Sequence, residues 1–154
     1  MHAIPSSVLT ALYSKPTMIK LTKALQAVTT QLRHFAAGSG YWSVMDEVFG
    51  VTEGQAAAHS VQDQLSRGAL VQLARVEVIS ASQLGPARAA YASANGTIYL
   101  SDSFLAESNQ AQLQATLLEE FGQAIDTRVN ASDRPGDEGE LFSLRVRGIT
   151  ANAS

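Results

Sequence analysis

The chain contains no cysteine, which excludes disulfides, thiolate metal sites and cysteine nucleophiles. It has no apolar run near the roughly 18 residues that a membrane-spanning helix needs, and its first residues lack the continuous apolar core of a secretory signal. No basic stripe is present, and the formal net charge is −3. A phosphate-binding glycine loop and a G-x-S-x-G serine elbow are also missing. We therefore expect neither a nucleic-acid partner nor a membrane span.

Length and composition predict one globular domain. The chain has 154 residues, of which 45% are hydrophobic and 16% charged, and a domain of this size buries roughly two thirds of its unfolded surface. We expect a single domain over residues 19–150, after a weakly ordered segment, 1–18, and before a short tail, 151–154. Nine of the fourteen acidic residues lie after residue 100, against four basic residues there. A cation site is therefore expected in the C-terminal half, if the chain has one.

Helical spacing dominates the N-terminal half. Between Ile19 and Ala37, large apolar residues recur at the spacing of one helix face, and Gly38-Ser39-Gly40 then ends the pattern. The members of this face are Leu21, Leu25, Val28, Leu32 and Phe35. Shorter helices are expected over residues 41–49 and 55–66. These segments predict a helical N-terminal half.

The pattern changes near residue 75. Residues 75–80 alternate like a half-buried strand, and the strands expected at 89–94 and 97–100 flank Asn95-Gly96, a strong signal for a tight hairpin. A helical turn is expected over 102–107, a long helix from about 109 to 126 or 129, a loop over 130–136, and a closing helix over 137–147. We therefore predict an α+β fold with a small antiparallel sheet followed by two helices.

The long helix carries polar groups suited to chemistry. Glu119, Gln123 and Asp126 are spaced i, i+4 and i+7, so they share one face, and Glu120 lies about 100° away on its flank. This layout is similar to the zinc-peptidase pattern H-E-x-x-H, whose i and i+4 residues bind the metal and whose second residue is the general base. Glu119 and Gln123 would then be metal ligands and Glu120 the catalytic base. The alternative is a solvated helix face, which adjacent carboxylates commonly form.

A second acidic cluster opens the closing helix. Glu138 could complete a three-ligand site from this helix, with Asp137, Glu140 and Asp126 as secondary candidates. The alternative is that acids in a first helical turn simply interact with the helix dipole. Because the amide of Gln123 is a poor zinc ligand and an all-oxygen set suits harder cations, the sequence leaves zinc, calcium and no metal all open. The three histidines, His2, His34 and His59, all lie in the N-terminal half.

Several segments together resemble a zincin-like domain of large secreted cyanobacterial proteins, which commonly also carry hemolysin-type calcium-binding modules. The resemblance covers roughly residues 19–149, and in that family the long helix reads E-E-x-G-H-x-x-D. Glu119, Glu120, Gly122 and Asp126 match this motif, whereas Gln123 stands in place of the histidine. The other matching runs are Arg75-Val76-Glu77-Val78, Tyr91, Thr97-Ile98-Tyr99-Leu100-Ser101 and Pro135-Gly136-Asp137-Glu138-Gly139-Glu140-Leu141-Phe142-Ser143.

The resemblance implies a secreted, zincin-like, metallopeptidase-like domain that acts on a peptide or protein. Because Gln123 replaces the expected histidine, it also implies a catalytically degenerate pseudoenzyme. The alternative is a non-catalytic structural, adhesive or calcium-responsive module of a secreted multidomain protein. The sequence leaves both open.

Overall fold

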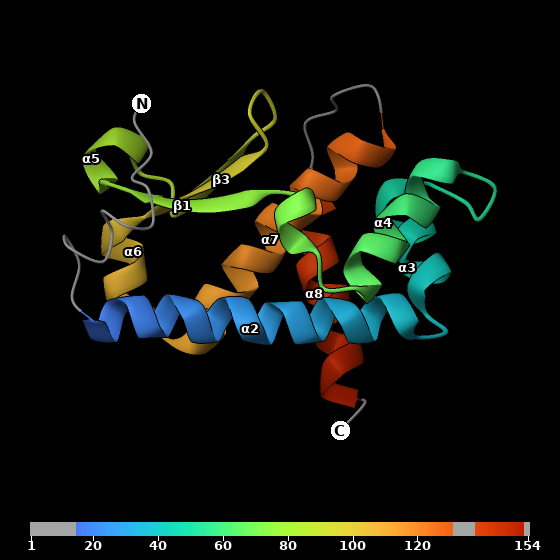
Figure 1. The fold of residues 1–154 in the computed structure, drawn as a ribbon, viewed down its shortest axis with the longest axis horizontal. Helices are drawn as coiled ribbons and strands as arrows, with labels where there is room; N and C mark the ends of the chain where they lie inside the picture. The colour runs from blue at the N-terminus through green and yellow to red at the C-terminus, as the bar shows by residue number, and fades with distance from the viewer. Residues whose placement is uncertain (1–14, 131–137, 153–154) are drawn as a thin grey trace.

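The computed structural model describes residues 15–130 and 138–152 (Figure 1). The N-terminal half is helical as expected, with α2 (Lys15–Ala37), α3 (Tyr41–Phe49), α4 (Ala56–Ser66) and a short 3-10 turn, η1 (Leu70–Gln72). The sheet region holds β1 (Arg75–Ile79), α5 (Ala81–Leu84), β2 (Ala89–Ala92) and β3 (Thr97–Ser101). The chain continues with α6 (Asp102–Glu107), α7 (Gln110–Val129) and α8 (Glu138–Asn152). None of the helices in these described ranges is both long and apolar enough to cross a bilayer.

The predicted α+β class is confirmed, with small differences at the helix ends. Helix α2 begins at Lys15 rather than at Ile19, and α8 continues past Arg147 to Asn152. The predicted loop over 130–136 lies, apart from Asn130, outside the described residues. In Figure 1 the sheet lies over the N-terminal half of α2, and α3 and α4 lie near its C-terminal end. Helices α2 and α7 therefore lie on one side of the small sheet.

The sheet is mixed, so the prediction of an antiparallel sheet was wrong in part. Its order is β1-β3-β2. The hairpin around Asn95-Gly96 is confirmed, since β2 pairs antiparallel with β3, but β1 pairs parallel with β3. Helix α5 and strand β2 lie between β1 and β3 in sequence. Strand β2 runs opposite to β1, and the hairpin then reverses the chain, so β3 runs in the same direction as β1. Alternation predicts strands and the faces of their side chains, but it carries no signal for the direction of a non-local partner.

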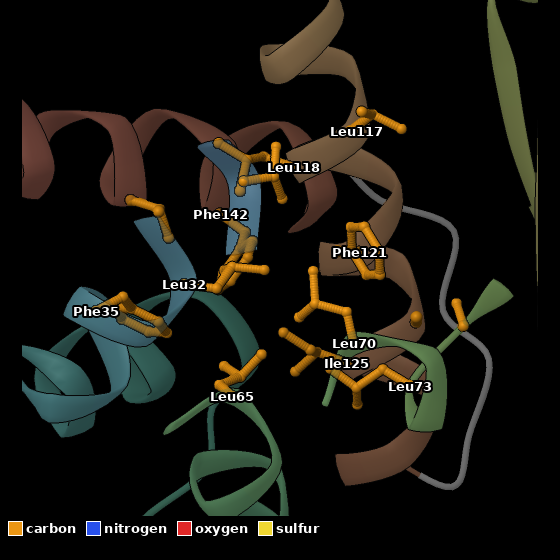
Figure 2. Packing of buried hydrophobic residues seen from close by; sticks show 14 of the residues in the cluster. Leu32, Phe35, Leu65, Leu70, Leu73, Leu117, Leu118, Phe121, Ile125 and Phe142 are labelled. Atoms are coloured by element: carbon orange, nitrogen blue, oxygen red, sulfur yellow. The ribbon is translucent and has the colours of Figure 1, made fainter. Parts of the chain in front are cut away.

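Helix α7 is the centre of the fold. Asn109 caps it, because the Asn109 side chain accepts from the backbone of Gln112 and the Gln112 side chain accepts in return from the backbone of Asn109. The predicted apolar face is buried, with Leu113, Leu117, Phe121 and Ile125 each at most 1% exposed. Figure 2 shows Phe121 and Ile125 directed into the same interior as Leu70 and Leu73. Burial of this face leaves the polar face of α7 directed at β2 and α8.

Helices α7 and α8 approach each other at two glycines. A Cβ at Gly122 would lie 3.0 Å from the Cα of Gly139 and from two side-chain atoms of Phe142. A Cβ at Gly139 would overlap the carbonyl oxygen of Glu119. Phe142 is fully buried and meets Phe35 of α2 edge to face, with 5.4 Å between ring centroids (Figure 2). This close crossing fixes the first turn of α8 beside Glu119 and Gln123.

Candidate functional site

An open groove lies between strand β2 and helix α7. Its volume is about 360 Å³. Strand β2 is an edge strand of the sheet, so one wall of the groove carries backbone groups that no neighbouring strand uses. The residues along the groove are Ala90, Tyr91, Ser93, Glu120, Gln123, Asp126 and Thr127. Three of the predicted site residues, Glu120, Gln123 and Asp126, are therefore brought together here.

Glu120 lies at the free edge of β2. Burial raises the pKa of its carboxyl group, and the negative charge of Glu119 raises this pKa further. A hydrogen bond from the backbone of Tyr91 acts in the opposite direction and lowers it. The Ser101 amide donates to the carbonyl of Arg88 across the hairpin. By strand alternation, the N–H of Tyr91 then points away from β3, toward α7. The Glu120 carboxyl group therefore already occupies the outward N–H of Tyr91, and its raised pKa makes it a better proton acceptor than an ordinary glutamate.

Glu119 does not line the groove, although it lies one helical turn before Gln123, which does. Burial raises the pKa of its carboxyl group and the charge of Glu140 adds to this effect, while Arg88 and Arg147 act in the opposite direction. The backbone carbonyl of Glu119 is the atom that approaches Gly139 most closely. Glu119 is therefore a neighbour of α8, and it does not line the groove with Glu120.

Gln123 connects the groove to α8. It lines the groove, and its amide also lies against Gly139, where a Cβ would come within 2.7 Å of Nε2. The predicted first and second ligand positions, Glu119 and Gln123, therefore both face the first turn of α8. Their shared direction follows from the i and i+4 spacing, and their role as metal ligands stays a prediction.

Asp126 is tied into the fold. Its side chain is 7% exposed and accepts a hydrogen bond of 2.7 Å from Nδ2 of Asn130. The same amide nitrogen donates to the carbonyl of Phe49, at 3.1 Å. Because this amide joins the end of α7 to the end of α3, Asp126 has a structural role there in addition to lining the groove.

The acidic cluster of α8 is only partly near this site. Glu138 is half-buried, and its Oε2 is shielded from solvent with no hydrogen-bond partner among the described residues. Glu140 is exposed. Asp137 lies outside the described residues. Within residues 15–130 and 138–152, no three His, Cys, Asp or Glu side chains are grouped so that they could hold a metal ion. The ligand set of Glu119, Gln123 and Glu138, two carboxylates and an amide, therefore stays a prediction.

The structure adds residues to the predicted site. Tyr91 lines the groove, and its hydroxyl lies 3.5 Å from Oγ1 of Thr127. Thr127 follows Glu120 by seven residues, so helical spacing could have placed it on the same face. No local pattern predicts that β2 lies beside this face, since that contact joins segments far apart in sequence.

Comparison with protein-family models, curated proteins and solved structures finds no match for this chain. The fold places the chain in the α+β class. Its function is therefore argued from the groove and the side chains around it.

Proposed function

We propose that this chain is a metallopeptidase-like domain with a degenerate site. The groove between β2 and α7 would hold an extended peptide or protein segment, and Gln123 would weaken metal binding enough to leave hydrolysis weak or absent. The observation that carries this proposal is the position of Glu120 and Gln123, which lie together in the groove against an edge strand. An edge strand offers backbone groups to an extended peptide.

Glu120 is the proposed proton acceptor. Burial favours its neutral form, and a carboxyl group whose pKa is moved toward neutral pH exchanges protons efficiently at that pH. A divalent cation in such a site supplies polarisation of a carbonyl group and a lower pKa for water. The chain's own contribution is a carboxylate at the strand edge that can take up a proton.

Glu119, Gln123 and Glu138 are the residues that would hold a cation. Oε2 of Glu138 supports this, because it has no hydrogen-bond partner in the described part of the chain and a shielded carboxylate oxygen without a partner is costly. The set is nevertheless a poor match to zinc, which prefers imidazole or thiolate with carboxylate, and an amide is a weak replacement for histidine. We therefore expect little or no zinc binding by the natural chain.

The same oxygen donors support a second candidate, a non-catalytic, calcium-responsive module. Calcium takes carboxylate and amide oxygens and tolerates irregular geometry. In that case the pair α7 and α8 would be stabilised by calcium, and the groove would serve binding alone. The two candidates differ in the metal that binds and in whether restoring a histidine creates a zinc site.

The test is calorimetric titration of Zn²⁺ and Ca²⁺ into the natural chain and into Gln123→His. Restoring imidazole at the i+4 position from Glu119 should raise zinc affinity by at least about tenfold, because a third protein ligand is worth more than 1.4 kcal/mol. The matched control is Gln26→His, which places a histidine on the exposed face of α2. Adding Glu119→Ala or Glu138→Ala to Gln123→His should remove the gain.

The outcomes separate the candidates. Zinc binding that appears in Gln123→His and is absent in Gln26→His supports the degenerate peptidase, and a peptidase assay of that variant is then the next step. Calcium binding by the natural chain that Glu138→Ala removes supports the calcium-responsive module. If Gln123→His binds zinc no better than Gln26→His does, the proposed ligand geometry is wrong.

A further inference from the structure

The two edges of the sheet have different surroundings. At one edge, β2 lies beside α7, and Glu120 accepts from the backbone of Tyr91. At the other edge, β1 borders an open groove of about 400 Å³. Unused backbone groups at the edge of a sheet are a template for another strand. The edge of β1 is therefore a candidate interaction surface, separate from the proposed peptidase-like site.

The register fixes which groups point outward from β1. The Arg75 backbone N–H donates to the Gly96 carbonyl at 3.0 Å, so the backbone N–H and C=O groups of Arg75 and Glu77 point toward β3. Val76, between them, directs its N–H and C=O away from the sheet. Within the described ranges no hydrogen bond engages these two groups. Val78 also points outward but is 0% exposed, so the accessible edge is limited to residues 75–77.

The groove beside this edge is largely apolar. Val71 at its rim is 76% exposed, more than the other exposed large hydrophobic residues of the described chain, Ile19 and Leu144. The apolar residues along the groove include Leu25, Leu70, Val71, Val76 and Phe121. A strand added at Val76 would cover this apolar surface and would also form hydrogen bonds with the outward N–H and C=O of Val76.

The charges at the edge determine which strand fits. Arg75 and Glu77 lie on the same face of β1, and within the described ranges neither is in a salt bridge. An antiparallel strand centred opposite Val76 would need an acid facing Arg75 and a base facing Glu77. Read in the antiparallel direction, β1 itself supplies this sequence, Arg75-Val76-Glu77.

From this self-complementarity we propose that β1 pairs with β1 of a second copy of this chain. Val76 lies opposite Val76 of the second copy on a two-fold axis, and the two residues exchange N–H···O=C hydrogen bonds. Arg75 faces Glu77 of the second copy, and the symmetry repeats the pair. The dimer is independent of the groove between β2 and α7, so it stands or fails separately from the proposed function.

Sedimentation velocity over a concentration series tests the dimer. The natural chain should associate reversibly, with weaker association at high salt because the ion pairs are exposed. Arg75→Glu or Glu77→Arg alone should weaken association by about tenfold or more, because each change makes both symmetric pairs like-charged. The double exchange, Arg75→Glu with Glu77→Arg, should restore association. Restoration cannot arise from a general loss of folding.

Two further variants address the backbone and the apolar rim. Val76→Pro removes the outward N–H, which an edge strand tolerates, and should abolish association while circular dichroism stays unchanged. Val71→Ser should weaken association, whereas Leu144→Ser, a change at another exposed apolar residue outside this groove, should not.

Three results would overturn the proposal. The first is a natural chain that is monomeric at every concentration. The second is a double exchange that associates no better than the single reversals. The third is a monomer that binds a short peptide containing Arg-Val-Glu, because the edge would then serve a strand of another protein.

Discussion

Substitution of Gly139 by alanine tests the α7–α8 crossing, which places the backbone of Gly139 against Glu119 and Gln123. An added Cβ would overlap the carbonyl oxygen of Glu119 and lie 2.7 Å from the Gln123 amide. The amide can rotate away, but the carbonyl belongs to the backbone of α7. The helices must therefore separate for the variant to fold.

The cost follows from overpacking. Extra atoms in a tightly packed site cost about 1–3 kcal/mol, and contact with rigid backbone places Gly139→Ala in the upper part of that range. For a chain of this size, a loss of about 2–3 kcal/mol lowers the Tm by roughly 4–12 °C. The matched control is Gly148→Ala on the same helix, where an added Cβ meets nothing within 4 Å. Alanine should raise stability there by up to about 1 kcal/mol, because glycine is a poor helix former.

Urea denaturation of both variants measures the expected loss of unfolding free energy in Gly139→Ala and the expected gain in Gly148→Ala. The double variant Gly139→Ala with Gln123→Ala identifies the atom responsible, since it removes the side chain and leaves the Glu119 carbonyl in place. We expect it to recover little stability. If Gly139→Ala is as stable as Gly148→Ala, the close crossing and the site geometry built on it are wrong.

Three further predictions concern the polar groups. Because the pKa of Glu120 is raised in the folded state, its stabilising contribution is complete below the ordinary glutamate value of 4.5 and is lost as the pH rises through the folded-state pKa. Glu120→Gln should therefore flatten the fall in unfolding free energy above pH 4.5. An unchanged slope would contradict the raised pKa of Glu120. Ser143→Ala should lower the free energy of unfolding, measured by thermal denaturation, by about 1 kcal/mol, because the buried hydroxyl donates to the Ala115 carbonyl at 2.9 Å. The control Thr22→Ala, on the exposed face of α2, should lower it by less. Asn130→Ala should cost about 1–3 kcal/mol in urea denaturation, because it leaves the buried Asp126 carboxylate without that donor; a loss as small as that of Thr22→Ala would show that this bond is not structural.

Periodicity predicted the helices well, because local spacing decides which face of a helix is apolar. The face of α7 that includes Leu117 and Phe121 is buried as expected, and the Asn95-Gly96 hairpin forms where its turn residues indicate. The parallel pairing of β1 with β3 was missed, since pairing direction depends on the path of the intervening chain. The separation of Glu119 and Glu120 around the helix was predicted, but the elements beside them were not: Glu120 lies in the groove at β2, and the backbone of Glu119 lies against Gly139 of α8.

The sequence by itself determined the class of the fold, the long polar-faced helix and the positions of Glu119, Glu120 and Gln123 along it, because these follow from helical and strand periods. Only the tertiary structure decided which elements those side chains meet. It placed Glu120 and Gln123 in a groove at the edge of β2, tied Asp126 to Asn130, and left the edge of β1 open at Val76. Those contacts join segments far apart in the chain, and they depend on how whole faces pack rather than on the spacing of neighbouring residues.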